Sequence, residues 1–90
     1  MKDIVFLSVD SSNVLGFCIK HNVLDALLLK YKDLIEIEVF SEYKGKGSFV
    51  YLSKIRKFGS SFGVSIPKKL VKELNFKKDE SLQVDFRKPA

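Results

Sequence analysis

The most constraining feature of this 90-residue chain is the order of patterns between Ser53 and Phe86. A basic, β-rich run comes first, followed by a loop of glycine and serine and a short apolar run that ends at Pro67. Apolar residues at helical spacing come next, and a run that alternates apolar with polar residues closes the stretch. The stretch therefore predicts a strand, a tight turn, a second strand, a helix that begins beside Pro67, and a third strand.

The first half of the chain repeats this order in a weaker form. From Gly16 onward an offset of 47 residues aligns the halves, with Gly16 on Gly63. Before the loop an offset of 45 fits better by residue type, which implies that the first copy lacks two residues between its opening strands. Internal repeats usually pack on each other because one unit cannot bury its apolar face alone. We therefore expect one domain made of repeat 1, residues 1–45, and repeat 2, residues 46–90.

Apolar periodicity and turn residues predict a mostly β fold with two short helices. Asn22 is a candidate cap for the first helix, and Pro67 suits the start of the second. We expect strands at 4–9, 14–19, 34–40, 49–58, 62–66 and 81–86, helices at 21–31 and 67–75, and a turn at 44–47.

Positive charge is concentrated in the second half. The chain carries 16 Lys and Arg against 11 Asp and Glu, which gives a net charge of +5. Residues 1–45 hold five lysines and seven acids, whereas residues 46–90 hold eleven basic residues and four acids. This one-sided surplus favours an anionic partner such as nucleic acid, with an ordinary solvated surface as the alternative.

Several classes of protein are disfavoured. Cys18 is the single cysteine, so we expect a small buried residue, no disulfide within the chain and a cytoplasmic location. His21 has no second histidine or clustered acids beside it, and no catalytic or phosphate-binding motif occurs, so we expect no enzyme activity, cofactor or metal. The N-terminal residues lack a signal-peptide pattern, and no apolar run approaches the roughly 20 residues of a membrane span.

The second half resembles the SpoVT/AbrB/MazE family of DNA-binding domains. The resemblance rests on the run Ile55–Pro67, IRKFGSSFGVSIP, followed by Leu70, Leu74 and the pair Asp79-Glu80. In that family a basic strand, a Gly-Asn/Arg-Ser loop, a strand closing on Ile-Pro, a helix and a Gly-Asp pair occur in the same order. The chain departs from the family pattern inside the loop and at the acidic pair, and its first half is far more degenerate.

The resemblance implies an AbrB-like swapped-hairpin β-barrel. In the family, two short chains interlace their strands and carry the helices at the sides. Because both copies lie in one chain here, the resemblance implies an intrachain pseudo-dimer of two β-β-α-β repeats. The fourth strand of each family unit would then come from Phe49–Leu52 for the first repeat and from Ile4–Leu7 for the second. A further homodimer of such chains stays open.

Six residues are the candidate DNA contacts. Lys54 and Arg56 share a face in a regular strand, whereas Lys57 points to the other side unless the strand bends. Basic side chains give salt-dependent affinity, and serine hydroxyls suit phosphate oxygens. The alternatives are a solvated strand edge for the lysines, turn formation for the serines, and packing instead of base stacking for Phe58. Strand position selects Lys54, and the family motif implies Arg56, Lys57, Ser60, Ser61 and Ser65.

The leading hypothesis is a sequence-specific or semi-specific protein that binds double-stranded DNA, such as a transcriptional regulator or nucleoid-associated factor. The first copy has Asp10 and no Lys or Arg in its loop, so we expect it to serve as scaffold. The alternative is a MazE-like antitoxin or another protein-interaction module, with a toxin as partner. The end of the chain at Ala90 disfavours it, because family antitoxins carry a long C-terminal segment.

Overall fold

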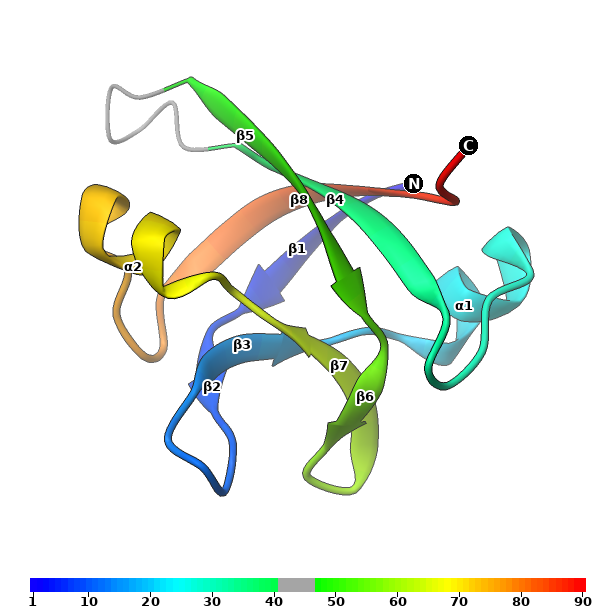
Figure 1. Ribbon diagram of the computed structural model, residues 1–90, viewed down its shortest axis with the longest axis horizontal. Helices are drawn as coiled ribbons and strands as arrows, with labels where there is room; N and C mark the ends of the chain where they lie inside the picture. Colours follow the sequence, from blue (N-terminus) through cyan, green and yellow to red (C-terminus); the bar gives the residue numbers. More distant parts are fainter. Residues whose placement is uncertain (41–46) are drawn as a thin grey trace.

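The computed structural model describes residues 1–40 and 47–90, which form two antiparallel sheets with a helix at each side (Figure 1). The first sheet has the strand order β1-β8-β4-β5, and the second has the order β2-β3-β7-β6. The predicted fold class, mostly β with two short helices, is confirmed. The elements are β1 (Lys2–Phe6), β2 (Ser8–Val9), β3 (Leu15–Cys18), α1 (His21–Leu27), β4 (Leu34–Phe40), β5 (Ser48–Lys54), β6 (Arg56–Phe58), β7 (Ser61–Ser65), α2 (Lys68–Leu74) and β8 (Ser81–Arg87).

Two bends carry the chain from the first sheet into the second. β1 continues into β2 after Leu7, and β5 continues into β6 after Ile55. At the bends the N–H of Leu7 donates to the carbonyl of Glu80 at 2.8 Å, and the N–H of Ile55 donates to the carbonyl of Asp33 at 2.9 Å. The two long opening strands expected from the sequence are therefore each broken in two, because Leu7 and Ile55 turn into the core.

A closed barrel is not detected among the described strands. The first sheet ends at β1 and β5, and the second ends at β2 and β6, so each sheet is open in its pairing order. The predicted fourth strands do form: β5 pairs with β4, and β1 pairs with β8. Of the predicted turn at 44–47, residues 44–46 lie outside the described residues.

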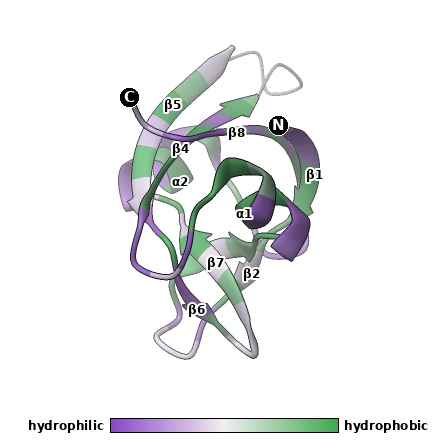
Figure 2. Cartoon of the chain, turned by 90° about the vertical axis from the view of Figure 1, so that its right-hand side faces the viewer, coloured by the Kyte–Doolittle hydropathy of each residue, from purple (hydrophilic) through white to green (hydrophobic). Residues whose placement is uncertain are grey.

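The core fills the space between the two sheets. Alternation along β4 sends Ile35, Ile37 and Val39 inward, where they are fully buried. Phe17 from β3 and Phe86 from β8 meet in this layer with their ring centroids 6.1 Å apart. Figure 2 shows hydrophobic bands along the strands of both sheets. The core therefore depends on side chains that both halves of the chain supply.

Each helix ends at a residue with a left-handed backbone conformation, and these two residues are 47 positions apart. α2 starts after Pro67 and stops at Asn75, which has φ of 53°, as its sequence predicts. α1 stops at Leu28, with φ of 56°, and is shorter than the predicted 21–31. The reason is that the chain turns back to bury Leu29, whose N–H donates to the carbonyl of Leu24 at 2.9 Å. Asn22 does not cap α1, because Lys20 holds the N-cap position without a side-chain bond.

The pairing registers correct the alignment of the two repeats. The helices, and the strands β4 and β8, are related by the predicted offset of 47. In the opening strands, Phe6 pairs with Ser81, and Lys54 pairs with Leu34. Because Leu34 and Ser81 are equivalent residues of the two halves, Phe6 is equivalent to Lys54, and the opening strands are related by 48 residues and not by 45. The first copy therefore has one residue more before its second strand, not two fewer. The offset of 45 matched residue types, but a slip of three residues exchanges the inward and outward faces of a strand.

Two glycines let β3 and β7 approach each other closely. A Cβ atom on Gly16 would lie 2.2 Å from the carbonyl oxygen of Val64, and one on Gly63 would lie 2.5 Å from that of Phe17. The side chain of Phe58 lies over both glycines, at 3.0 Å and 2.8 Å from the same Cβ positions. A side chain at either glycine would therefore push the backbones of the central strands apart.

Replacement of Gly16 by alanine tests this close approach. Gly16→Ala should lower the free energy of unfolding by about 1–3 kcal/mol or more, because overpacking forces the backbone to shift. Urea unfolding followed by circular dichroism measures the change. Gln83→Ala, at an exposed position of β8, is the control and should leave stability nearly unchanged. A Gly16→Ala variant as stable as the native chain would show that the strands are farther apart than described.

Paired charges occupy the centre of the outer face of the first sheet. Arg87 on β8 forms ion pairs with Glu36 at 3.0 Å, with Asp85 at 3.3 Å and with Glu38. The N-terminal ammonium of Met1 lies 2.8 Å from the carboxylate of Asp85 and lowers the pKa of that carboxyl. A hydrogen bond from Ser48, and to a smaller extent one from Arg87, lowers the pKa of Glu38. These carboxylates therefore favour the folded state when they are ionised.

Acid should remove this contribution. A carboxyl group whose pKa is lower in the folded state stabilises that state above its unfolded pKa of about 4, and the contribution is lost as the pH falls through the folded value. Thermal unfolding between about pH 6 and pH 2 should show a midpoint that declines below about pH 4. Asp85→Asn should flatten part of that decline. An unchanged acid profile in this variant would contradict the role assigned to Asp85.

Candidate nucleic-acid interface

Two hairpins project side by side from the second sheet, away from the first sheet (Figure 1). The first is formed by β2 and β3, and the second by β6 and β7. They are joined by the central pairing of β3 with β7, in which Phe17 faces Val64. Because one hairpin comes from each half of the chain, this end of the molecule brings the two predicted loops together.

The second hairpin has a two-residue turn. Phe58 pairs with Ser61, which leaves Gly59 and Ser60 at the tip. Gly59 has φ of +66°, whereas Ser60 keeps a negative φ, the pattern of a type II′ turn with glycine first. The turn twists in the sense of the flanking strands, so it presents Ser60 in a fixed position at the exposed tip.

The candidate contacts do not share one face. Arg56 pairs with Gly63, so by alternation Arg56, Ser61 and Ser65 lie on the face of the second sheet that points away from the core. Lys57 pairs with Phe62 and lies on the opposite face, as predicted for a regular strand. Lys54 belongs to the first sheet, because the chain bends at Ile55. Lys54 and Arg56 are both exposed on either side of the buried Ile55, as alternation predicts, but the bend places them in different sheets.

A groove of about 760 Å³ separates the hairpin tips. Residues 8–12 and Cys18 form one wall, and residues 56–61 form the other. The groove therefore brings together four of the six candidates, Arg56, Lys57, Ser60 and Ser61, while Lys54 and Ser65 lie outside it.

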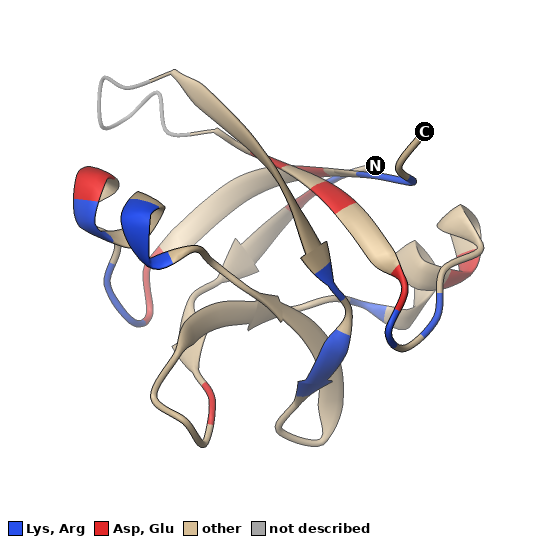
Figure 3. Ribbon diagram, viewed as in Figure 1, with Lys and Arg blue, Asp and Glu red and all other residues tan. Residues whose placement is uncertain are grey.

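Charge differs between the two walls (Figure 3). Lys54, Arg56 and Lys57 are exposed, and within residues 1–40 and 47–90 none of them has an ion-pair partner. The contrast is with Arg87, whose guanidinium is neutralised by three carboxylates. Arg56 and Lys57 on the second wall, and Lys54 at the end of β5, are therefore available to an anion from outside.

The first hairpin uses its acid for local structure. One carboxylate oxygen of Asp10 accepts hydrogen bonds from the N–H groups of Ser12 at 2.8 Å and Val14 at 3.0 Å. This arrangement is an Asx-type turn, which holds the tip between β2 and β3. The carboxylate still places negative charge on the first wall, so this wall adds hydroxyl groups from Ser11 and Ser12 but no cation to the groove.

The sequence predicts the burial of one side chain near the groove, Phe58, but not the exposure of another, Cys18. Phe58 packs and does not stack outward: it is 4% exposed and covers the two close glycines. Cys18 is exposed and not a core residue, because Phe17 takes the inward position of β3. The thiol lies 3.9 Å from the carbonyl oxygen of Phe58 and lines the groove. The alternation of Leu15, Phe17 and Ile19 is the signal that could have placed Cys18 outward.

The part of the chain that the structure describes, residues 1–40 and 47–90, offers little for other kinds of site. It holds no group of three or more His, Cys, Asp or Glu residues placed to bind a metal ion. None of its helices is long and apolar enough to cross a membrane. His21 packs edge-on against the ring of Phe62 at 5.8 Å.

Comparison with protein-family models, with curated proteins and with solved structures finds no match. The family resemblance therefore stays a prediction, and the case for a nucleic-acid interface depends on the geometry and charge described above.

Proposed function

We propose that this protein binds double-stranded DNA through its second hairpin, as a transcriptional regulator or nucleoid-associated protein of the cytoplasm. Arg56, Lys57 and Lys54 supply the positive charge that meets phosphate groups. The hydroxyls of Ser60, Ser61 and Ser65 act as further donors to the backbone. The observation that carries the proposal is the cluster of exposed basic side chains, without carboxylate partners in the described chain, at a projecting hairpin with a serine tip.

We propose in addition that the fold is a swapped-hairpin pseudo-dimer within one chain. Two pairings of equivalent strands support this: β3 with β7, centred on Phe17 and Val64, and β4 with β8, centred on Glu38 and Asp85. Both centres join residues 47 apart. The exchange of opening strands also supports it, because β1 pairs with β8 of the other half and β5 pairs with β4.

The two halves then take different roles on DNA. The pseudo-dimer presents two hairpins, but only the second carries cations, since the first holds Asp10 and serines. Each phosphate neutralised contributes about −0.9 to the slope of log K against log salt on duplex DNA. Three cations therefore predict a slope of about −3 for one chain. A regulator with two equivalent basic hairpins would give a slope about twice as steep.

A second candidate function is protein binding, as in an antitoxin that holds a toxin. It is favoured by the large apolar side chains exposed on the outer face of the first sheet, among them Ile4, Phe6, Val50 and Leu52. These side chains lie on the two edge strands of the sheet, β1 and β5, and exposed apolar surface can serve as an interaction site. Apart from Lys54, which lies at the end of β5 on this face, the proposed DNA contacts belong to the second sheet, so the two candidate functions use largely different surfaces.

DNA binding is tested by fluorescence anisotropy with a labelled duplex over a range of salt concentrations. The double variant Arg56→Ala with Lys57→Ala should weaken binding by about tenfold or more at low salt and reduce the magnitude of the slope by about two. The matched control is Lys77→Ala with Lys78→Ala, which removes the same charge from an exposed loop after α2. Equal losses in both variants, or no salt-dependent binding by the native chain, would contradict the proposal.

A further inference from the structure

Strand β1 lies at an edge of the first sheet and exposes large apolar side chains on its outer face. Its only strand partner in the described chain is β8. Lys2, Ile4 and Phe6 alternate on the outer face, where Ile4 is 60% and Phe6 is 68% exposed. Edge strands with exposed apolar residues are templates for pairing with another chain. We therefore expect either a feature that blocks uncontrolled pairing at this edge or a specific partner that covers it.

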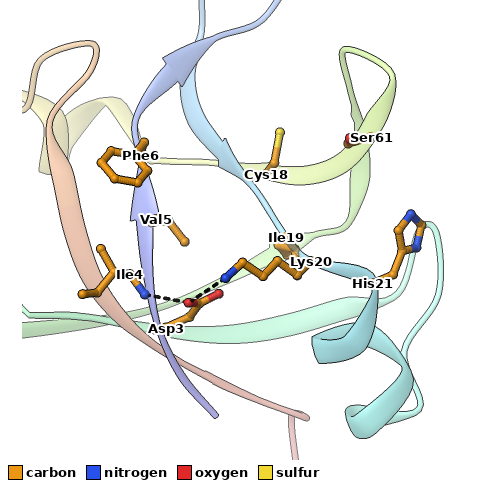
Figure 4. A pocket seen from close by; sticks show the side chains of 9 residues that line it. All are labelled: Asp3, Ile4, Val5, Phe6, Cys18, Ile19, Lys20, His21 and Ser61. Atoms are coloured by element: carbon orange, nitrogen blue, oxygen red, sulfur yellow. Dashed lines mark hydrogen bonds and ion pairs between the residues drawn. The ribbon is translucent and has the colours of Figure 1, made fainter.

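The backbone of β1 has free pairing positions. Met1 and Leu7 bond toward the β8 side, the carbonyl of Met1 to the N–H of Phe86 and the N–H of Leu7 to the carbonyl of Glu80, each at 2.8 Å. By alternation, the N–H and C=O groups of Lys2, Ile4 and Phe6 point away from β8. The N–H of Ile4 donates instead to its neighbour Asp3, at 2.8 Å (Figure 4). One side-chain oxygen thus occupies the place that a new strand's carbonyl would take.

A hollow lies beside this edge. It measures about 330 Å³ and separates β1 from the start of α1, with Lys20 reaching across to Asp3 at 3.4 Å (Figure 4). A second hollow of about 500 Å³ continues past Ile4 and Phe6 to Lys2 and Gln83. On the opposite edge, β5 has Tyr51 at the position equivalent to Asp3, and its side chain packs against the core. The smaller aspartate leaves the β1 corner open to an apolar side chain.

We propose that a second copy of this chain docks on this edge, with the two β1 strands antiparallel and centred on Ile4. In this register Ile4 meets Ile4 of the second copy, and Lys2 meets its Phe6. The apolar side chains then cover one another, and each ammonium lies beside an aromatic ring. No like charges face each other directly, because Asp3 is opposite Val5.

The choice of a second copy follows from self-complementarity. The outward backbone groups of Ile4 can bond to the same groups of its counterpart, since residues that point their N–H and C=O outward form the hydrogen-bonded pairs of an antiparallel ladder. Asp3 gives up the N–H of Ile4 and keeps its ion pair with Lys20. The chain already pairs equivalent strands antiparallel twice, β3 with β7 and β4 with β8. The inference does not depend on DNA binding.

Disulfide trapping tests the register. In a Cys18→Ser background, Ile4→Cys should give a covalent dimer on mild oxidation, because hydrogen-bonded antiparallel pairs place their Cα atoms about 5.5 Å apart, within disulfide range. The matched control is Leu52→Cys, at the equivalent position of β5 and 55% exposed, which should stay monomeric. Cross-linking of Leu52→Cys to the same extent, or no cross-linking of Ile4→Cys, would overturn the proposal.

Sedimentation of the unmodified chain over a wide concentration range gives an independent measurement. The native protein should show a monomer–dimer equilibrium, and Phe6→Glu should weaken it by about tenfold or more. Leu52→Glu, at the position equivalent to Ile4 on β5, adds the same charge at an exposed apolar side chain and should leave it unchanged. Circular dichroism confirms that each variant is folded. A monomeric mass for the native chain at every concentration, or equal weakening by both variants, would overturn the proposal.

Discussion

The close contact of β3 with β7 is the constraint on which the rest of the molecule depends. Gly16 and Gly63 bring the two backbones together, and Phe58 closes over them from the outer side. This contact joins the two hairpins at one end, while Phe17 and Val64 face the core from the same pairing. The same pairing of β3 with β7 thus determines both the distance between the hairpins and the packing of the core.

Much of the fold could be predicted from the sequence, because its signals are local. Alternation predicts β4 and β8, and Pro67 and Asn75 mark the two ends of α2. The early end of α1 has no such signal, since Leu28 is neither glycine nor asparagine and the stop depends on burial of its neighbour. The sequence therefore predicts an element best where its ends are set by local residue preferences and not by tertiary packing.

The candidate site was predicted in part for the same reason. The turn predicted from Gly59, Ser60 and Ser61 does form, but its tip is only Gly59-Ser60, because Ser61 already pairs with Phe58 as the first residue of β7. The bend at Ile55 does not, because its backbone groups bond to residues 32 and 33, which are distant in sequence. Residue types around the bend resemble an ordinary strand, so only tertiary structure reveals that Lys54 and Arg56 lie in different sheets.

The pairing of β1 with β8 has a consequence for the synthesis of the protein. β1 is made long before β8, so the first sheet cannot be completed until β8 has left the ribosome. The pairing of β4 with β5 joins neighbouring strands and can form earlier, because its loop-closure cost is smaller. Until β8 emerges, Ile4 and Phe6 belong to a strand without its pairing partner, which other nascent chains or chaperones can reach before the fold is finished.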